Sequence, residues 1–481
     1  MIPLIKKSLS PRWPTWLLVL LTIFIPLQHR FYKIFKPLSR KIAEHQGELP
    51  LYFEKNFCFY VTDLIVLFLF VKMLFATPNH WRTFLWAKGG KYLILLLATA
   101  FISILFSSHH NYGLQYFRLF QFGISFLLFS ALANGTSVKE ILPKIFWCIT
   151  FLALFECVVG ISQYFIQGEL GLRFLGEIKL NSKVEAPANF LMSDGSRWIF
   201  DRLFHLTTGP NIILRAPGTF PHPNVFGGFL VFSSIVSYCL YCWVSTKRER
   251  LFLSFAIPLQ LFTLCLTFSR AALIGWLLGT TLWLVLFFRT EMADFRPKLK
   301  SFIPILFTSG CLCLCLLYPQ FLERGGVVNY NHVSRTADKE RLIYQDIAFQ
   351  MVKKNPLIGV GFNNFLIEME GFTKGEKKPD LFQIPHNIYL LLLSETGILG
   401  LGFFLLFIGS VIVGTLRGEK TLFSLTLLTL FLAFLWLGCC DYYPLITQHG
   451  KLMFFMVAGF LASYAPKRLS ANVQPQPLEG F

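Results

Sequence analysis

Long apolar runs alternate with short polar segments along almost the whole chain. Each run is close in length to the ~20 residues that a helix needs to cross a bilayer. Open strands cannot satisfy their backbone hydrogen bonds in lipid, so we expect the runs to be helices. The pattern predicts an all-α polytopic membrane protein with about twelve transmembrane helices. The twelve runs are residues 14–29, 57–75, 92–107, 114–133, 143–165, 224–244, 251–268, 271–288, 301–318, 387–413, 421–438 and 449–465.

Two of the segments between the runs are long. Residues 166–223 are rich in turn formers and have no clear period, whereas residues 319–386 contain an amphipathic helix at about 337–354. The apolar residues that recur at helical spacing in this helix are Leu342, Ile343, Ile347, Met351 and Val352. Its first turn is acidic, its last turn is basic, and Asn355-Pro356 ends it. A long loop with its own helix is typical of an active-site lid, which we expect between spans nine and ten.

Clusters of Lys and Arg between the runs indicate the orientation of the chain. Six such clusters fall on one side of the predicted bundle, which the positive-inside rule assigns to the cytoplasm. Both termini then lie inside, and the two long segments lie outside. We expect residues 1–466 to form a single transmembrane domain, followed by a cytoplasmic tail at 467–481. The basic segment 30–56 disagrees with this rule because it is predicted to lie outside, where it could bind anionic head groups.

Composition narrows the class of protein. Of the 481 residues, 54% are hydrophobic and only 15% are charged, so a large apolar area must face lipid. The net charge of +18 does not indicate a nucleic-acid surface, because Lys and Arg occur in short clusters between apolar runs. Nine of the eleven Cys lie inside those runs and act there as small hydrophobic residues rather than as a disulfide framework. The first run is followed by no signal-peptide cleavage site and is interpreted as an uncleaved span.

Three short polar segments stand at the ends of apolar runs, and the predicted topology places all three at the outer face. Arg and His are costly near lipid, so their position at one depth indicates a site for an anionic, lipid-linked substrate. Asp63, Arg118 and Glu156 lie in the outer parts of their spans, and with them we expect a polar cavity open to the exterior. The three segments are Arg215 to Asn224 with His222, Ser269-Arg270, and His386-Asn387.

These residue types suit glycosyl transfer from a lipid pyrophosphate. Two arginines, Arg215 and Arg270, can hold pyrophosphate oxygens and offset the charge that develops on the leaving group. A neutral imidazole such as that of His386 can accept a proton from an acceptor hydroxyl. Taken singly, each residue has a simpler explanation: Arg270 could reach lipid head groups, Arg215 could be solvated, His386 could cap a helix and His222 could order a turn. Their joint placement on one face favours the catalytic interpretation.

The same segments resemble the O-antigen ligase/polymerase superfamily of bacterial envelope enzymes. The clearest match begins at His386, where His-Asn, nine residues, Gly397, two residues and Gly400 are similar to the ligase pattern H-[N/S/Q]-x9-G-x-x-[G/T/Y]. Three further segments resemble the family: Arg215 with Gly-Thr-Phe and His222-Pro-Asn224, Thr267-Phe-Ser-Arg270-Ala-Ala, and the stretch from Arg341 to Phe365. The resemblance covers residues 200–410 and is only topological elsewhere.

The resemblance implies a GT-C-like, multi-pass glycosyltransferase of the bacterial inner membrane with its active site on the periplasmic face. Such an enzyme transfers a glycan from undecaprenyl pyrophosphate to an acceptor hydroxyl with inversion, and without a metal or another cofactor. The roles it implies are a catalytic base for His386, donor pyrophosphate contacts for Arg215, Arg270 and Arg341, and supporting roles for His222, Asn224, Ser269 and Asn387. Partners would be the lipid-linked glycan, the acceptor and membrane lipids, with no nucleic acid.

Several alternatives stay open at this point. The acceptor could be lipid A-core in a ligase, the growing glycan in a polymerase, or a protein in a relative; the histidine motif favours the ligase. A transporter or flippase for the lipid-linked glycan would need charged residues through the whole membrane depth, and spans six to twelve have no central ionisable residue. A metal site would need clustered carboxylates, for which Glu368-Met-Glu370 is the only near match in the outer loops. The sugar, the acceptor and the oligomeric state cannot be read from the sequence.

Overall fold

The structure of the chain is a computed structural model. The residues it describes are 15–27, 30–33, 58–76, 86–108, 112–134, 138–180, 189–191, 212–290, 295–324, 332–372 and 383–466. Apart from Arg30–Lys33 (β1), the basic segment 30–56 lies outside them, as does the predicted tail 467–481.

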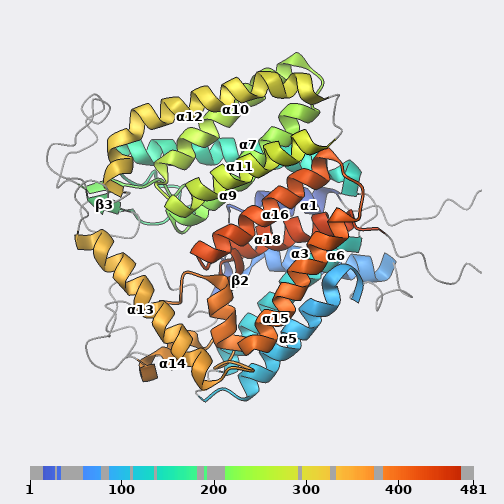
Figure 1. Cartoon of the computed structure of the whole chain (residues 1–481), viewed down its shortest axis with the longest axis vertical. Helices are drawn as coiled ribbons and strands as arrows, with labels where there is room; N and C mark the ends of the chain where they lie inside the picture. The colour runs from blue at the N-terminus through green and yellow to red at the C-terminus, as the bar shows by residue number, and fades with distance from the viewer. Residues whose placement is uncertain are drawn as a thin grey trace, which may run out of the picture.

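The described part of the chain is predominantly helical (Figure 1). The helices are α1 (Thr15–Ile23), α3 (Val61–Ala76), α5 (Gly90–Leu105), α6 (Tyr112–Asn134), α7 (Val138–Ile166), α9 (Pro223–Trp243), α10 (Lys247–Leu266), α11 (Arg270–Arg289), α12 (Arg296–Arg324), α13 (His332–Lys354), α14 (Phe365–Phe372), α15 (Ile388–Leu416), α16 (Leu422–Cys440), α17 (Tyr443–Ile446) and α18 (Gln448–Ser463). Two 3-10 turns are η2 (Ala87–Gly89) and η3 (Arg173–Leu175). Two short antiparallel ribbons, β1 (Arg30–Lys33) with β2 (Cys58–Tyr60) and β3 (Asn189–Leu191) with β4 (Ile212–Leu214), complete the fold.

Each of the twelve predicted runs overlaps a helix of the structure. Eight helices are long and apolar enough to cross a membrane: α6, α7, α9, α10, α11, α12, α15 and α16. The remaining four runs correspond to α1, α3, α5 and α18, which are 9 to 16 residues long. The chain is therefore a multi-pass helical membrane protein with eight such spans in its described part, and the count of twelve stays a prediction.

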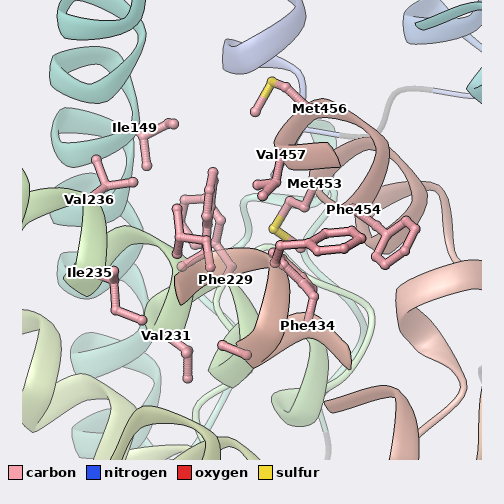
Figure 2. Packing of buried hydrophobic residues seen from close by; sticks show 14 of the residues in the cluster. Ile149, Phe229, Val231, Ile235, Val236, Phe434, Met453, Phe454, Met456 and Val457 are labelled. Atoms are coloured by element: carbon pink, nitrogen blue, oxygen red, sulfur yellow. The ribbon is translucent and has the colours of Figure 1, made fainter. Parts of the chain in front are cut away.

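Helix α9 forms the centre of the bundle. It packs against α7, α10, α11 and α16, and its apolar window is wholly buried. Figure 2 shows Phe229, Val231, Ile235 and Val236 of α9 meeting side chains from α7, α16 and α18. Lipid is as apolar as these side chains, so close packing rather than the hydrophobic effect favours such helix contacts. Gly228 of α9 leaves room for Tyr443 of α17, because a Cβ at residue 228 would overlap the Tyr443 hydroxyl. Tyr443 is thereby fitted against the start of α9.

Helix α15 is interrupted at Gly397, where φ is +67° and ψ is −170°. The segment that precedes α14 fills the break: Val360 N–H donates to Ser394 O (2.9 Å), and Ile398 N–H donates to Pro356 O (2.9 Å). These contacts satisfy backbone groups that a helix break would otherwise leave unpaired. A Cβ at residue 397 would overlap the Leu357 carbonyl, so glycine is required there. The spacing between His386 and Gly397 in the family pattern thus marks the length of the first half of α15.

Helices α13 and α14 lie at one end of the bundle and share a small core with the first half of α15 (Figure 1). Helix α13 corresponds to the amphipathic helix predicted at about 337–354 but begins earlier, at His332. Ile347 and Met351 are buried as the spacing predicts, whereas Leu342 is 65% exposed. Helix α12 continues through Pro319 to Arg324, six residues beyond the predicted end of its span at 318. The segment between α12 and α13 is correspondingly shorter than predicted.

Candidate active site

Arg215 is held in a buried position at the start of the segment that leads into α9. Its side chain is only 2% exposed. Arg215 Nε donates to the Thr267 carbonyl (2.8 Å), and Nη2 donates to Asn224 Oδ1 (2.6 Å). Ala216 N–H also donates to Leu266 O (3.1 Å), which ties the same segment to the end of α10. The guanidinium is therefore fixed by Asn224, nine residues further along the chain, and by Thr267, 52 residues further along.

His222 and Asn224 form the first turn of α9. His222 is the N-cap residue, and its Nδ1 accepts the Asn224 backbone N–H (3.0 Å). Burial, together with the nearby charge of Arg215, lowers the pKa of His222 to about 3. A neutral ring whose Nδ1 already accepts a hydrogen bond serves as a helix cap. The expectation that His222 orders a turn agrees with this geometry.

The turn that joins α10 to α11 carries Thr267, Phe268, Ser269 and Arg270. Phe268 has φ of +46°, a left-handed conformation that is uncommon for a non-glycine residue. Such strain tends to persist where neighbouring structure fixes it, often at a functional site. Here the turn presents the Thr267 carbonyl to Arg215 and places the exposed Arg270 at the first position of α11. Ser269 is buried, and its backbone N–H donates to Thr267 Oγ1 (3.3 Å).

His386 and Asn387 stand at the start of α15. Asn387 is the N-cap: its Oδ1 accepts the N–H groups of Tyr389 and Leu390 (both 2.9 Å), and its Nδ2 donates to Cys439 O (3.2 Å). Asn387 therefore joins the start of α15 to the end of α16. The ring of His386 lies 5.1 Å from that of Tyr442, and its Nε2 is 3.4 Å from Gln383 Oε1.

Asp441, at the end of α16, is a site residue that the sequence reasoning missed. It is 5% exposed, and its Oδ1 lies 3.4 Å from His386 Nδ1 while its Oδ2 accepts Asn224 Nδ2 (2.9 Å). Burial alone would raise the pKa of Asp441, but the contacts with His386, Asn224 and His222 outweigh burial, and the pKa lies below its ordinary value. Asp441 follows the run 421–438, so the rule that identified the other segments also places it at the outer face.

A continuous chain of polar contacts therefore runs from Arg215 through Asn224 and Asp441 to His386. The His386–Asp441 distance of 3.4 Å is longer than a good hydrogen bond, so it is a loose contact rather than a tight one. The other two links, at 2.6 and 2.9 Å, are within the hydrogen-bonding range. Three segments that are distant in the sequence contribute these residues: Arg215 to Asn224 before and at the start of α9, Asp441 after α16, and His386 before α15. Folding thus joins Arg215, Asn224 and His386 in one chain of contacts, and their assignment to an active site stays a prediction.

Positive charge accumulates around this chain. Burial lowers the pKa of Arg215 well below its ordinary value, and the like charges of Arg324, Arg341 and Arg270 add to the effect, while Asp441 opposes it. Arg270 and Arg341 were predicted for this site, whereas Arg324, at the end of α12, was not. Among the residues that the structure describes, the charges that act most strongly on Arg215 are thus three like charges and one carboxylate. A bound polyanion would relieve the repulsion among them.

Asp63, Arg118 and Glu156, which were expected in one polar cavity, have different hydrogen-bond partners in the structure. Asp63 accepts Gln448 Nε2 (2.7 Å), and Arg118 donates to Gln121 (2.8 Å), in a polar group between α3, α6 and α18. Glu156 on α7 instead accepts two hydrogen bonds from Thr219. Within the residues that the structure describes, no three His, Cys, Asp or Glu side chains come together as metal ligands.

Comparison with known families supports the class of protein that this arrangement indicates. The model of the O-antigen ligase family matches residues 254–405, a range that contains Arg270, Arg341 and His386. The resemblance to O-antigen ligases is therefore confirmed for this part of the chain. The matched range ends before Asp441 and begins after Arg215 and Asn224. No curated protein matches the chain.

Proposed function

We propose that the protein transfers a glycan from an undecaprenyl pyrophosphate donor to an acceptor hydroxyl at the periplasmic face of the bacterial inner membrane. The observation that carries this proposal is the polar chain Arg215–Asn224–Asp441–His386 with three more arginines beside it. Both termini would then lie in the cytoplasm, in agreement with the distribution of Lys and Arg between the spans.

The arginines bind the donor in this mechanism. Guanidinium groups hold phosphate oxygens with paired N–H donors, and Arg270 and Arg341 lie near enough to Arg215 for their charges to act on it. The charge on pyrophosphate increases as the glycosidic bond breaks. A fixed cluster of positive charge stabilises that state more than it stabilises the intact donor, which lowers the barrier.

His386 is the base, and Asp441 is a positioning residue for it. The acceptor oxygen attacks the anomeric carbon from the face opposite the pyrophosphate and forms the new C–O bond. The old C–O bond breaks, its electron pair leaves with undecaprenyl pyrophosphate, and His386 takes the hydroxyl proton. Asp441 faces Nδ1 of His386 and favours the tautomer in which Nδ1 carries hydrogen and Nε2 can accept this proton. Inversion at the anomeric carbon follows from attack at the opposite face.

Ligation of O-antigen to lipid A-core is the acceptor reaction that we favour. The histidine pattern and the description of the matching family as O-antigen ligase support it. Polymerisation of the glycan and transfer to protein use the same chemistry at the donor. Deleting the gene distinguishes ligation from polymerisation. Loss of all O-chain from lipopolysaccharide indicates a ligase, whereas retention of a single capped unit indicates a polymerase.

Paired arginine variants test the proposal. Arg270 and Arg289 stand at the two ends of α11, about 28 Å apart at the helical rise of about 1.5 Å per residue. We expect Arg270→Ala to reduce transfer at least a hundredfold and Arg289→Ala to leave it unchanged, with both variants present in the membrane in normal amounts. His386→Ala should likewise abolish transfer. Near-normal glycan attachment by Arg270→Ala or His386→Ala contradicts the assigned roles.

A further inference from the structure

The segment that carries Arg215 rests on the side chains of α7. This segment, residues 214–219, has few backbone hydrogen bonds of its own and instead contacts Glu156, Gln163 and Gln167. Leu214 N–H donates to Gln167 Oε1 (2.8 Å), one residue before the arginine. The three α7 residues are spaced at 156, 163 and 167, so they lie along one face of the helix.

Glu156 holds the far end of the segment. Its two carboxyl oxygens accept the Thr219 backbone N–H (2.9 Å) and the Thr219 hydroxyl (2.7 Å). Glu156 is fully buried and Thr219 is 2% exposed. Gly218 has φ of +61°, and a Cβ there would lie 2.6 Å from Glu156 Oε2, so the backbone approaches the carboxyl group as closely as glycine allows.

Gln163 fixes the middle of the segment through both halves of its amide. Its Oε1 accepts Gly218 N–H (2.9 Å), and its Nε2 donates to Gly218 O (3.0 Å) and to Glu177 Oε1 (2.8 Å). The carboxyl oxygen of Glu177 also accepts Leu170 N–H (2.8 Å). Because Glu177 Oε1 acts as an acceptor, the NH₂ group of Gln163 and not its oxygen must face it, and this fixes the orientation of the Gln163 amide. Its pairing with Gly218 is therefore defined.

We propose that Glu156 and Gln163 are positioning residues for the donor site, which they control by setting the conformation of the segment that carries Arg215. This inference rests on the donor-binding role of Arg215 in the proposed function. A carboxyl group buried on a membrane helix is costly, and in the part of the chain that the structure describes Glu156 offsets that cost through its two hydrogen bonds from Thr219. Among the described contacts, neither Glu156 nor Gln163 touches the Arg215–His386 chain, so any effect on the donor passes through the backbone of 214–219.

Glu156 offers an informative pair of substitutions. Glu156→Leu fills the space but leaves both Thr219 donors unpaired, which releases the segment. Glu156→Gln can keep both contacts, because its oxygen accepts the Thr219 N–H while the hydroxyl turns to accept from the new NH₂ group. Thr150→Val is a matched control, since it removes the buried Thr150–Ser237 hydrogen bond elsewhere on α7.

The experiment measures binding of undecaprenyl pyrophosphate to the purified full chain in lipid nanodiscs, with each variant made in the wild-type and Arg215→Ala backgrounds. We expect Glu156→Leu to weaken binding about tenfold, while Glu156→Gln and Thr150→Val stay within about threefold of wild type. In the Arg215→Ala background, Glu156→Leu should have no further effect. A side chain that only stabilises the fold would give the same loss in both backgrounds.

Three results would overturn the inference. The first is an unchanged affinity in Glu156→Leu, and the second is an equal loss of affinity in both backgrounds. If Glu156→Leu does not fold, Thr219→Val takes its place: it removes the hydroxyl that donates to Glu156, and its binding is compared in the wild-type and Arg215→Ala backgrounds in the same way. The third is wild-type binding by Arg215→Ala, which overturns the donor role in the proposed function as well; the first two results leave that role standing.

Discussion

Asp441→Asn isolates the effect of the carboxylate that faces His386. The side chain keeps its shape, so the change replaces one acceptor oxygen by an NH₂ group. Asp441 accepts Asn224 Nδ2 at Oδ2 and faces His386 Nδ1 with Oδ1, which also accepts the Tyr442 N–H (2.8 Å). A carboxylate can accept at both oxygens, whereas an amide can accept only at one.

Neither orientation of the new amide satisfies its neighbours. If the NH₂ group faces Asn224, two donors meet, and Asn224 cannot turn over because its oxygen accepts Arg215, which has only donors. If the NH₂ group faces His386, Nδ1 must become the acceptor. The proton then moves to Nε2, and that nitrogen can no longer take a proton from the acceptor hydroxyl.

The magnitude follows from the loss of the base. General base catalysis contributes about 10² to 10⁴ in rate, and the same carboxylate-to-amide change in a Ser-His-Asp triad costs about 10⁴. We therefore expect kcat of Asp441→Asn to fall by about 10² to 10⁴. The donor KM should rise less than about tenfold, because the arginine cluster stays in place.

Transfer of glycan from a defined lipid pyrophosphate donor, followed over time with purified protein in nanodiscs, gives both constants. Glu395→Gln is the matched control: Glu395 is also 5% exposed, but it accepts the N–H groups of Asn363 and Phe365 instead of facing His386. We expect this control to lose thermal stability and to keep kcat within about threefold. The reasoning is refuted if Asp441→Asn keeps more than a tenth of wild-type kcat, or if the loss lies mainly in the donor KM.

Three further outcomes are expected. The pKa of His222 is lowered from 6.5 to about 3, so between these pH values the unfolded chain binds a proton at residue 222 that the folded chain does not. The free energy of unfolding therefore falls by up to about 1.4 kcal/mol for each pH unit in this window as the pH is lowered. His222→Asn, which keeps a cap acceptor, should reduce the fall in Tm between pH 7 and pH 5. Gly397→Ala should lower Tm by several degrees because a Cβ overlaps the Leu357 carbonyl, whereas Gly402→Ala in open space should not. EDTA should leave transfer intact; a strict loss restored by a divalent ion would contradict the metal-independent mechanism.

Sequence reasoning predicted most residues of the candidate site, because the order of apolar runs and polar segments indicates the depth of each residue in the membrane. Each polar segment at the end of an apolar run has a predictable side, and Arg215, Arg270 and His386 share one. The same rule would have identified Asp441, which directly follows a span, had the short connection after span eleven been treated like the others. Arg324 was missed because the apolar run ends at residue 318, whereas α12 continues through Pro319 to Arg324.

The partners of these residues could not be read from the chain. Asn224 and Asp441 are 217 positions apart, and their contact depends on how α9 and α16 pack. Glu156 and Asp63 are both predicted in outer parts of spans, yet Glu156 accepts from Thr219 and Asp63 accepts from Gln448. Depth is a single coordinate, and residues at one depth can still stand on different sides of the bundle.

The sequence by itself indicated a multi-pass helical membrane protein, its helices and the short polar segments that we propose form the site. The three-dimensional structure alone decided which helices are central. Helices α9 and α12 have mean hydropathies of 1.8 and 2.0, yet the window of α9 is 100% buried within the protein and that of α12 only 22%. In water, an apolar face must be buried against the protein, so hydropathy predicts burial. In a membrane, lipid and protein interior are equally apolar, and only side-chain packing distinguishes them.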